Sequence, residues 1–107
     1  MLKMTSMQLG PDDTSTPSTL TAALTLTRLS PQFQRLDPGA GDRVVTLPAE
    51  GKDVQGGNFM IEHVGTGTKA LTVQDDASNT ICSLVTTEIG IVFCNGVVWR
   101  GGVLKAT

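Results

Sequence analysis

The side chains that could carry out catalysis are few in this sequence, and they form no familiar catalytic pattern. The one histidine, His63, alternates with Phe59 and Ile61 on the apolar side of an expected strand. A nucleophilic site needs such a base to be held by an acid and to face a serine, but no nucleophile-elbow motif surrounds any Ser. A pairing of His63 with Cys82 or Cys94 stays open, although thiols buried in apolar strands are inert. We therefore expect a structural His63 and no enzyme activity.

The candidate metal ligands do not have the spacing of known metal sites. One His and two Cys, Cys82 and Cys94, lack a zinc pattern. Asp75, Asp76 and Asn79 could offer oxygen ligands to calcium, but no EF-hand spacing with its distal Glu follows them. Neighbouring Asp and Asn residues in a turn usually bond their own backbone. We expect no metal and no other cofactor.

Phosphate and sugar sites are also poorly supported. The segment from Gly65 to Lys69 lacks the spacing and the following helix of a P-loop, so it indicates a plain turn. Three glutamates, Glu50, Glu62 and Glu88, have no nearby aromatic residues that could stack on a sugar. Trp99 alone is a small platform, and we expect it to anchor the core or an interface instead.

Composition excludes several classes of partner. The 107 residues carry a formal net charge of -2, with 17% charged and 4% aromatic residues. This charge balance gives no attraction to nucleic acid or to anionic lipid. No apolar run approaches the roughly 18 residues of a membrane helix, and Met1 to Gly10 lacks the apolar core of a signal peptide. We expect one domain, no nucleic-acid or membrane partner, and reduced thiols at Cys82 and Cys94.

Residues 1–18 differ from the rest of the chain. They combine Pro, Asp, Ser and Thr with spaced apolar residues and show no sustained period. We interpret them as an extended N-terminal arm that either frays or docks on a neighbouring subunit. Residues 19–107 are expected to form a single β domain. The apolar residues of the arm are Leu2, Met4, Met7 and Leu9, together with Met1.

Apolar and polar residues alternate with period two through most of residues 19–107, which predicts short strands separated by turns. The Asn95-Gly96 pair between two apolar runs predicts a hairpin with a type I′ turn. Regular turns and the absence of a convincing helix predict an all-β fold, a small antiparallel β-sandwich or barrel that is jelly-roll-like. The expected strands are 20–29, 33–36, 43–47, 59–64, 71–73, 80–84, 89–94 and 97–99, and the expected core residues are Leu24, Leu26, Val45, Leu47, Ile61, Val73, Ile91 and Phe93.

A series of short segments between Arg28 and Gly102, about 70% of the chain, carries a family resemblance. Each segment alone is weakly specific for a family, and the segments become more specific when they occur together in this order. They are Gln34, Leu36, Asp37-Pro38, Arg43-Val44-Val45-Thr46-Leu47-Pro48, Phe59-Met60-Ile61, Leu71-Thr72-Val73, Asn79-Thr80-Ile81, Glu88, Ile91-Val92-Phe93-Cys94-Asn95-Gly96 and Trp99.

In this combination the chain resembles small β-rich virion proteins of tailed bacteriophages, especially head decoration (cement) proteins. The resemblance implies a homotrimer that sits on the capsid surface of the virion, assembled in the host cytoplasm. Such a trimer clamps neighbouring subunits of the major capsid protein against internal pressure. The candidate capsid or subunit interface residues are Leu2, Met4, Met7, Leu9, Trp99 and Arg100.

Two other functions stay open at this point. Related β-modules occur in tail fibres, spikes and head fibres, where exposed loops such as 50–57 would bind a receptor or a glycan. The third possibility is a carbohydrate- or peptide-binding sandwich outside a virus. A decoration protein should bind expanded capsids, whereas a receptor-binding module should bind cells or glycans without them.

Overall fold

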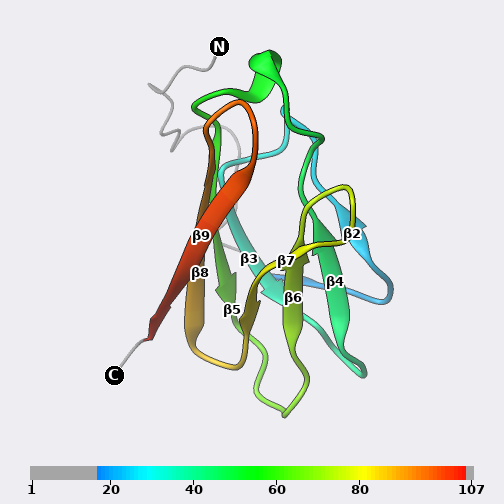
Figure 1. Ribbon diagram of the computed structural model, residues 1–107. Coiled ribbons are helices and arrows are strands. Elements are labelled where there is room, and N and C mark those ends of the chain that lie inside the picture. The colour runs from blue at the N-terminus through cyan, green and yellow to red at the C-terminus, as the bar shows by residue number, and fades with distance from the viewer. Residues whose placement is uncertain (1–16, 106–107) are drawn as a thin grey trace.

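Nine strands and one short 3-10 helix, η2 (Lys52–Val54), make up the part of the chain that the computed structural model describes, residues 17–105 (Figure 1). The strands lie in two sheets that pack face to face as a small β-sandwich. Sheet A has the order β1 (Ser18–Thr19), β3 (Phe33–Asp37), β5 (Asn58–His63), β8 (Glu88–Cys94) and β9 (Trp99–Lys105). Sheet B has the order β2 (Leu24–Thr25), β4 (Arg43–Thr46), β6 (Leu71–Gln74) and β7 (Thr80–Leu84).

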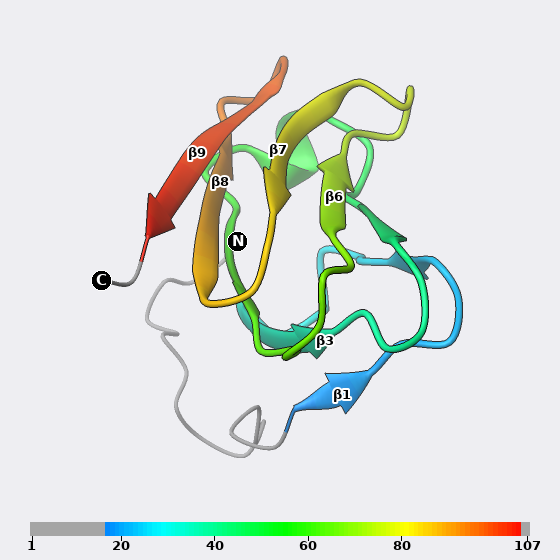
Figure 2. The same cartoon turned by 90° about the horizontal axis from the view of Figure 1, so that it is seen from below.

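The predicted all-β sandwich is confirmed, but both sheets are mixed and neither closes into a barrel. From β1 to β6 the chain alternates between the two sheets, as the turned view shows (Figure 2). Each strand therefore meets its sheet neighbour only after crossing the other sheet, and such a crossover makes the neighbours parallel. The pairs β1–β3, β3–β5, β2–β4 and β4–β6 are parallel. Only β5–β8, β6–β7 and β8–β9 are antiparallel, so the antiparallel, jelly-roll-like expectation is wrong on strand direction.

The core lies between the sheets and is built from aliphatic residues, with one aromatic pair. Phe59 and Trp99 pack with ring centroids 6.0 Å apart. Of the predicted core residues, Leu26, Val45, Leu47, Ile61 and Val73 are buried, and Leu24 is partly buried against the same cluster. The remaining buried apolar residues are Leu36, Val54, Leu71, Cys82, Leu84, Val92 and Cys94.

The face assignment of β8 corrects the prediction that Ile91 and Phe93 are core residues. Phe93 is exposed and Ile91 is half-buried, whereas Val92 and Cys94 point inward. The reason is Gly90, which shares the inner face. A Cβ at Gly90 would lie 3.1 Å from Sγ of Cys82 on the facing sheet, so the close approach of β7 excludes a larger side chain there.

The continuous strand predicted over residues 20–29 is absent, because the chain crosses from sheet A to sheet B within it. Leu20 still bonds sheet A, with its N–H 2.8 Å from the carbonyl of Asp37. Four residues later Leu24 pairs with Val45 of sheet B. The alternation of Leu and Thr indicates which residues face the core. However, only two residues of each strand, β1 in sheet A and β2 in sheet B, pair with a neighbouring strand.

The turn after β8 also differs from its prediction. Gly96 has a φ of 95°, but Asn95 is not among the described residues with positive φ, so the pair does not form a type I′ turn. Instead Gly96 and Val97 form the loop, and Oδ1 of Asn95 accepts the N–H groups of Val97 and Val98 at 2.8 and 3.0 Å. Strand β9 consequently starts at Trp99 and runs straight through Gly101 and Gly102.

Most of the expected arm, residues 1–16, lies outside the described residues. Ser18, which we expected at the end of the arm, is the first residue of β1 and pairs with Leu36. Ser18 therefore belongs to the β-sandwich, where β1 is the strand at one end of sheet A.

Candidate functional site

His63 is a core residue, as predicted, and both of its ring nitrogens are bonded to the backbone. Its Nε2 lies 2.7 Å from the carbonyl of Lys69, and its Nδ1 accepts the N–H of Gly65 at 3.1 Å. Because Nδ1 is an acceptor, Nε2 carries the proton and donates it to the Lys69 carbonyl. The imidazole thus fixes the 63–69 turn and has no serine or cysteine as a hydrogen-bond partner.

Glu88 is the buried carboxylate of sheet A and ties the corner between β7 and β8 to β9. Its Oε1 accepts the N–H of Val85 at 2.9 Å, and its Oε2 lies 2.9 Å from Nζ of Lys105. The pKa of Glu88 lies below its usual value, first because of the Val85 N–H and then because of the Lys105 ammonium. The carboxylate is therefore a structural anchor for the two ends of the β8–β9 hairpin.

The Asp75 loop uses its oxygens internally, as the turn interpretation predicted. Oδ1 of Asp75 accepts the N–H groups of Ala77 and Asn79 at 3.0 and 2.8 Å, and Oδ2 accepts the side-chain amide of Asn79. These bonds, led by the Asn79 N–H, lower the pKa of Asp75. Residues 17–105 contain no group of three or more His, Cys, Asp or Glu arranged to hold a metal ion.

Both cysteines are free thiols inside the sandwich. Cys82 lies on β7 and Cys94 on β8, and both are buried. Burial raises the pKa of the Cys82 thiol, which reduces its reactivity.

The predicted interface residues fall in three places. Leu2, Met4, Met7 and Leu9 lie outside the described residues. Trp99 lies in the core rather than at the surface, with Nε1 donating to the carbonyl of Pro48 at 2.8 Å. Arg100 is exposed on the outer side of β9.

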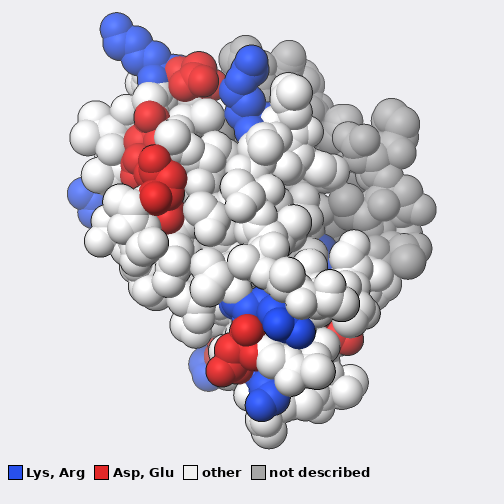
Figure 3. Space-filling view, turned by 90° about the vertical axis from the view of Figure 1, so that its right-hand side faces the viewer, with Lys and Arg blue, Asp and Glu red and all other residues white. Residues whose placement is uncertain are grey.

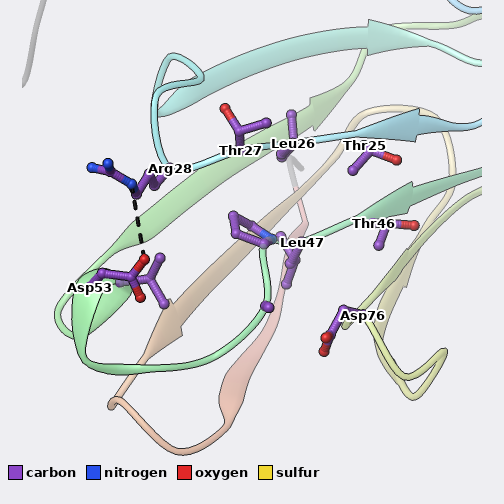
Figure 4. A pocket seen from close by; sticks show the side chains of 11 residues that line it. Thr25, Leu26, Thr27, Arg28, Thr46, Leu47, Asp53 and Asp76 are labelled. Atoms are coloured by element: carbon purple, nitrogen blue, oxygen red, sulfur yellow. Dashed lines mark ion pairs between the residues drawn. The ribbon is translucent and has the colours of Figure 1, made fainter.

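A shallow hollow of about 360 Å³ lies where the ends of β2 and β4 meet the loop around η2 (Figure 4). Its apolar lining includes Leu26, Leu47 and Val54. Arg28 and Asp53 form an ion pair of 4.0 Å at one end of the hollow, and Asp76 lies at the other. Both partners of the pair are mostly exposed, so the pair holds the loop only weakly.

The outer face of sheet B is polar without being charged. Thr25 pairs with Thr46, Thr46 with Gln74, and Thr72 with Ser83. The side of the molecule that carries β2 and β4 shows Lys, Arg, Asp and Glu near its ends and a broad uncharged area between them (Figure 3). We call this surface the uncharged face; its residues are Thr25, Val44, Thr46, Thr72, Gln74, Thr80 and Ser83.

The outer face of sheet A is apolar, which the sequence analysis missed. Phe33, Met60, Phe93 and Leu104 are 36%, 42%, 49% and 56% exposed, and all four point away from the core. The signal was present in β8, because a strand with apolar residues at nearly every position is usually covered on both sides. We call this surface the apolar face; its residues are Phe33, Met60, Ile89, Ile91, Phe93 and Leu104.

The apolar face shares the outer surface of sheet A with a few charged side chains. The outer surface of β3, β5, β8 and β9 over five residue rows covers roughly 300 Å² in projection, and it includes polar positions as well as the apolar face. Arg35 and Glu62 lie in the row of Ile89 and Leu104 and form an ion pair of 3.1 Å across β3 and β5, and Arg100 lies beside Phe93. An exposed apolar patch on a monomeric protein is often a binding surface.

Comparisons with known proteins identify no relative. No family model, curated protein or solved structure matches this chain. Among residues 17–105, no helix is long and apolar enough to cross a membrane.

Proposed function

We propose that this chain is a structural virion protein, a capsid decoration (cement) protein of a tailed bacteriophage. It binds the outer surface of the head as a homotrimer and stabilises the lattice of the major capsid protein. The observation that carries the proposal is the apolar face, a set of exposed apolar side chains on the outer side of sheet A of a rigid sandwich. The sequence resemblance to decoration proteins supports the same function.

A decoration protein needs stiffness and contact surfaces rather than reacting groups. The polar groups inside the sandwich stiffen it, because His63, Asp75 and Glu88 all bond backbone N–H groups of turns. Among the described residues, no buried side-chain nitrogen or oxygen lacks a hydrogen-bond partner. A network that is fully bonded in this way holds one conformation and resists deformation.

The two sheets supply different surfaces for assembly. The apolar face suits contacts between copies, because burial of apolar area drives association. The uncharged face offers Thr, Ser and Gln side chains that hydrogen-bond to a protein shell without the cost of removing charges from water. One chain can therefore join its copies through sheet A and meet the major capsid protein through sheet B.

Binding to phage heads tests the proposal. The purified chain is mixed with expanded heads that were assembled without a decoration protein, and with unexpanded heads of the same phage. We expect the chain to co-sediment with expanded heads at a saturating ratio of three chains per three-fold position. The matched control is Thr46→Lys with Thr72→Lys, which places charge on the uncharged face and should abolish binding. An absence of binding to expanded heads from any tailed phage tested would remove the proposal.

A tail-fibre, spike or head-fibre module remains the second candidate, and the hollow beside η2 favours it. The loop that was expected to carry a receptor site contributes Asp53 and Val54 to this hollow. The hollow is shallow, with an apolar floor and the Arg28–Asp53 ion pair at its rim, so it would make contact with one side of a bound group. Binding of the chain to host cells or glycans in the absence of capsids, lost in Arg28→Ala, would support this candidate.

A further inference from the structure

One residue row crosses the apolar face from a large side chain to an empty space. Phe33 of β3 pairs with Met60 of β5, Met60 pairs with Ile91 of β8, and Ile91 pairs with Gly102 of β9. A Cβ built on Gly102 would meet no atom within 4 Å. The row therefore has a protruding Phe33 ring at its β3 end and no side chain at its β9 end, at Gly102.

A rotation axis parallel to the strands would bring these two ends together. Such a rotation leaves every residue at its own height along the strand. It places the β3 side of one copy against the β9 side of the next, so the Phe33 ring faces the space above Gly102. The row is therefore complementary to itself, which a repeated interface between identical copies requires.

The free edge of β9 also requires cover. Strand β9 is the last strand of sheet A, and six of its seven residues are exposed. A long exposed edge strand that carries Val103 and Leu104 is a template for uncontrolled pairing unless a partner occludes it. A neighbouring copy seated over Gly102 occludes this edge.

We propose that copies of this chain associate through the apolar face about an axis parallel to the strands, with Phe33 of one copy seated over Gly102 of the next. The number of copies, three, rests on the proposed function. The contact itself rests on the row from Phe33 to Gly102.

The full-length chain and three variants test the contact by light scattering on a sizing column. Gly102→Leu fills the space without a clash inside its own subunit. The matched control is Gly67→Leu, because Gly67 also has no atom within 4 Å and lies in the loop before β6. Far-UV circular dichroism and thermal melting show whether each variant folds.

The wild-type chain and Gly67→Leu should have three times the 11.2 kDa chain mass, and Gly102→Leu should have one chain mass with an intact fold. Added hydrophobicity favours association, so a loss of mass in Gly102→Leu reports steric exclusion. Phe33→Ala in the Gly102→Leu background should restore the trimer by moving the large side chain to the other end of the row.

A wild-type monomer overturns the inference, because no second copy would then cover the apolar face. A trimer that Gly102→Leu leaves intact overturns it as well. Another oligomer that Gly102→Leu dissociates keeps the Phe33–Gly102 contact and contradicts the trimeric proposal. A trimer that dissociates as expected but never binds heads keeps the contact and removes the proposed function.

Discussion

Ile61 and Ile91 lie one row apart on the neighbouring strands β5 and β8 and point to opposite faces of sheet A. Ile61 pairs with Gly90 and is fully buried, whereas Ile91 pairs with Met60 on the apolar face. Substitution of these two isoleucines therefore compares how much the core and the outer surface each contribute to the free energy of unfolding.

Truncation of these two isoleucines should have unequal effects in the Gly102→Leu background, where we expect a single chain. Ile61→Ala should lower the free energy of unfolding by about 2–5 kcal/mol, because it leaves a cavity between the sheets. Ile91→Ala should lower it by about 1 kcal/mol or less, since that side chain already contacts water. Chemical denaturation measures both values. Equal losses would contradict the assignment of β8 residues to the two faces.

Replacement of His63 by Phe should destabilise the fold without creating a void. Phe fills a similar volume but leaves the Gly65 N–H and the Lys69 carbonyl without their partner. A buried polar group that loses its hydrogen bond costs about 1–3 kcal/mol. Urea unfolding of His63→Phe checks this value, and an unchanged midpoint would show that the imidazole does not hold the turn.

The stability contributed by Glu88 should depend on pH. Its pKa is lower in the folded chain than in the unfolded chain, mainly because of the Val85 N–H. The ionised carboxylate thus contributes stability that is fully present above the unfolded pKa, about 4.3, and is lost as the pH falls through the folded pKa. Wild type should melt above Glu88→Gln at pH 7, and the difference should shrink towards pH 3. Glu50→Gln, in the loop before η2, serves as the control. A difference that stays constant with pH would contradict the assignment.

The two thiols should react slowly in the folded protein. Cys82 and Cys94 are buried, and burial raises the pKa of the Cys82 thiol. Ellman's reagent should therefore modify neither thiol on mixing with the native chain and both thiols in denaturant. Rapid modification of the native protein would show that the sheets open near β7 and β8.

Much of the sandwich could be predicted from the sequence, because alternation and turn residues act locally. The segment from Thr80 to Leu84 is a strand with the predicted bounds, and the Asp75 turn bonds its own backbone as expected. Strand partners could not be predicted, since pairing between β3 and β5 joins residues 27 positions apart across a strand of the other sheet.

The errors have two physical causes. In β8, the alternation predicts an inward Ile91 and Phe93, but the sheets approach so closely that Gly90 occupies the inner face and Ile89, Ile91 and Phe93 point outward. In the turn after β8, the side-chain oxygen of Asn95 accepts the N–H groups of Val97 and Val98. Of the Asn95-Gly96 pair, only Gly96 has a positive φ. The apolar face went unnoticed because its residues come from four strands that are distant in the sequence.

The heat stability of expanded phage heads tests the central claim most directly. Heads assembled without a decoration protein are heated with and without a saturating amount of the chain, and release of DNA is followed by dye fluorescence. If the chain clamps the major capsid protein lattice, the disruption temperature should rise with bound chain and level off at saturation. The Thr46→Lys, Thr72→Lys variant should leave that temperature unchanged. Heads that bind the chain at saturation yet disrupt at an unaltered temperature would contradict the claim that it stabilises the capsid.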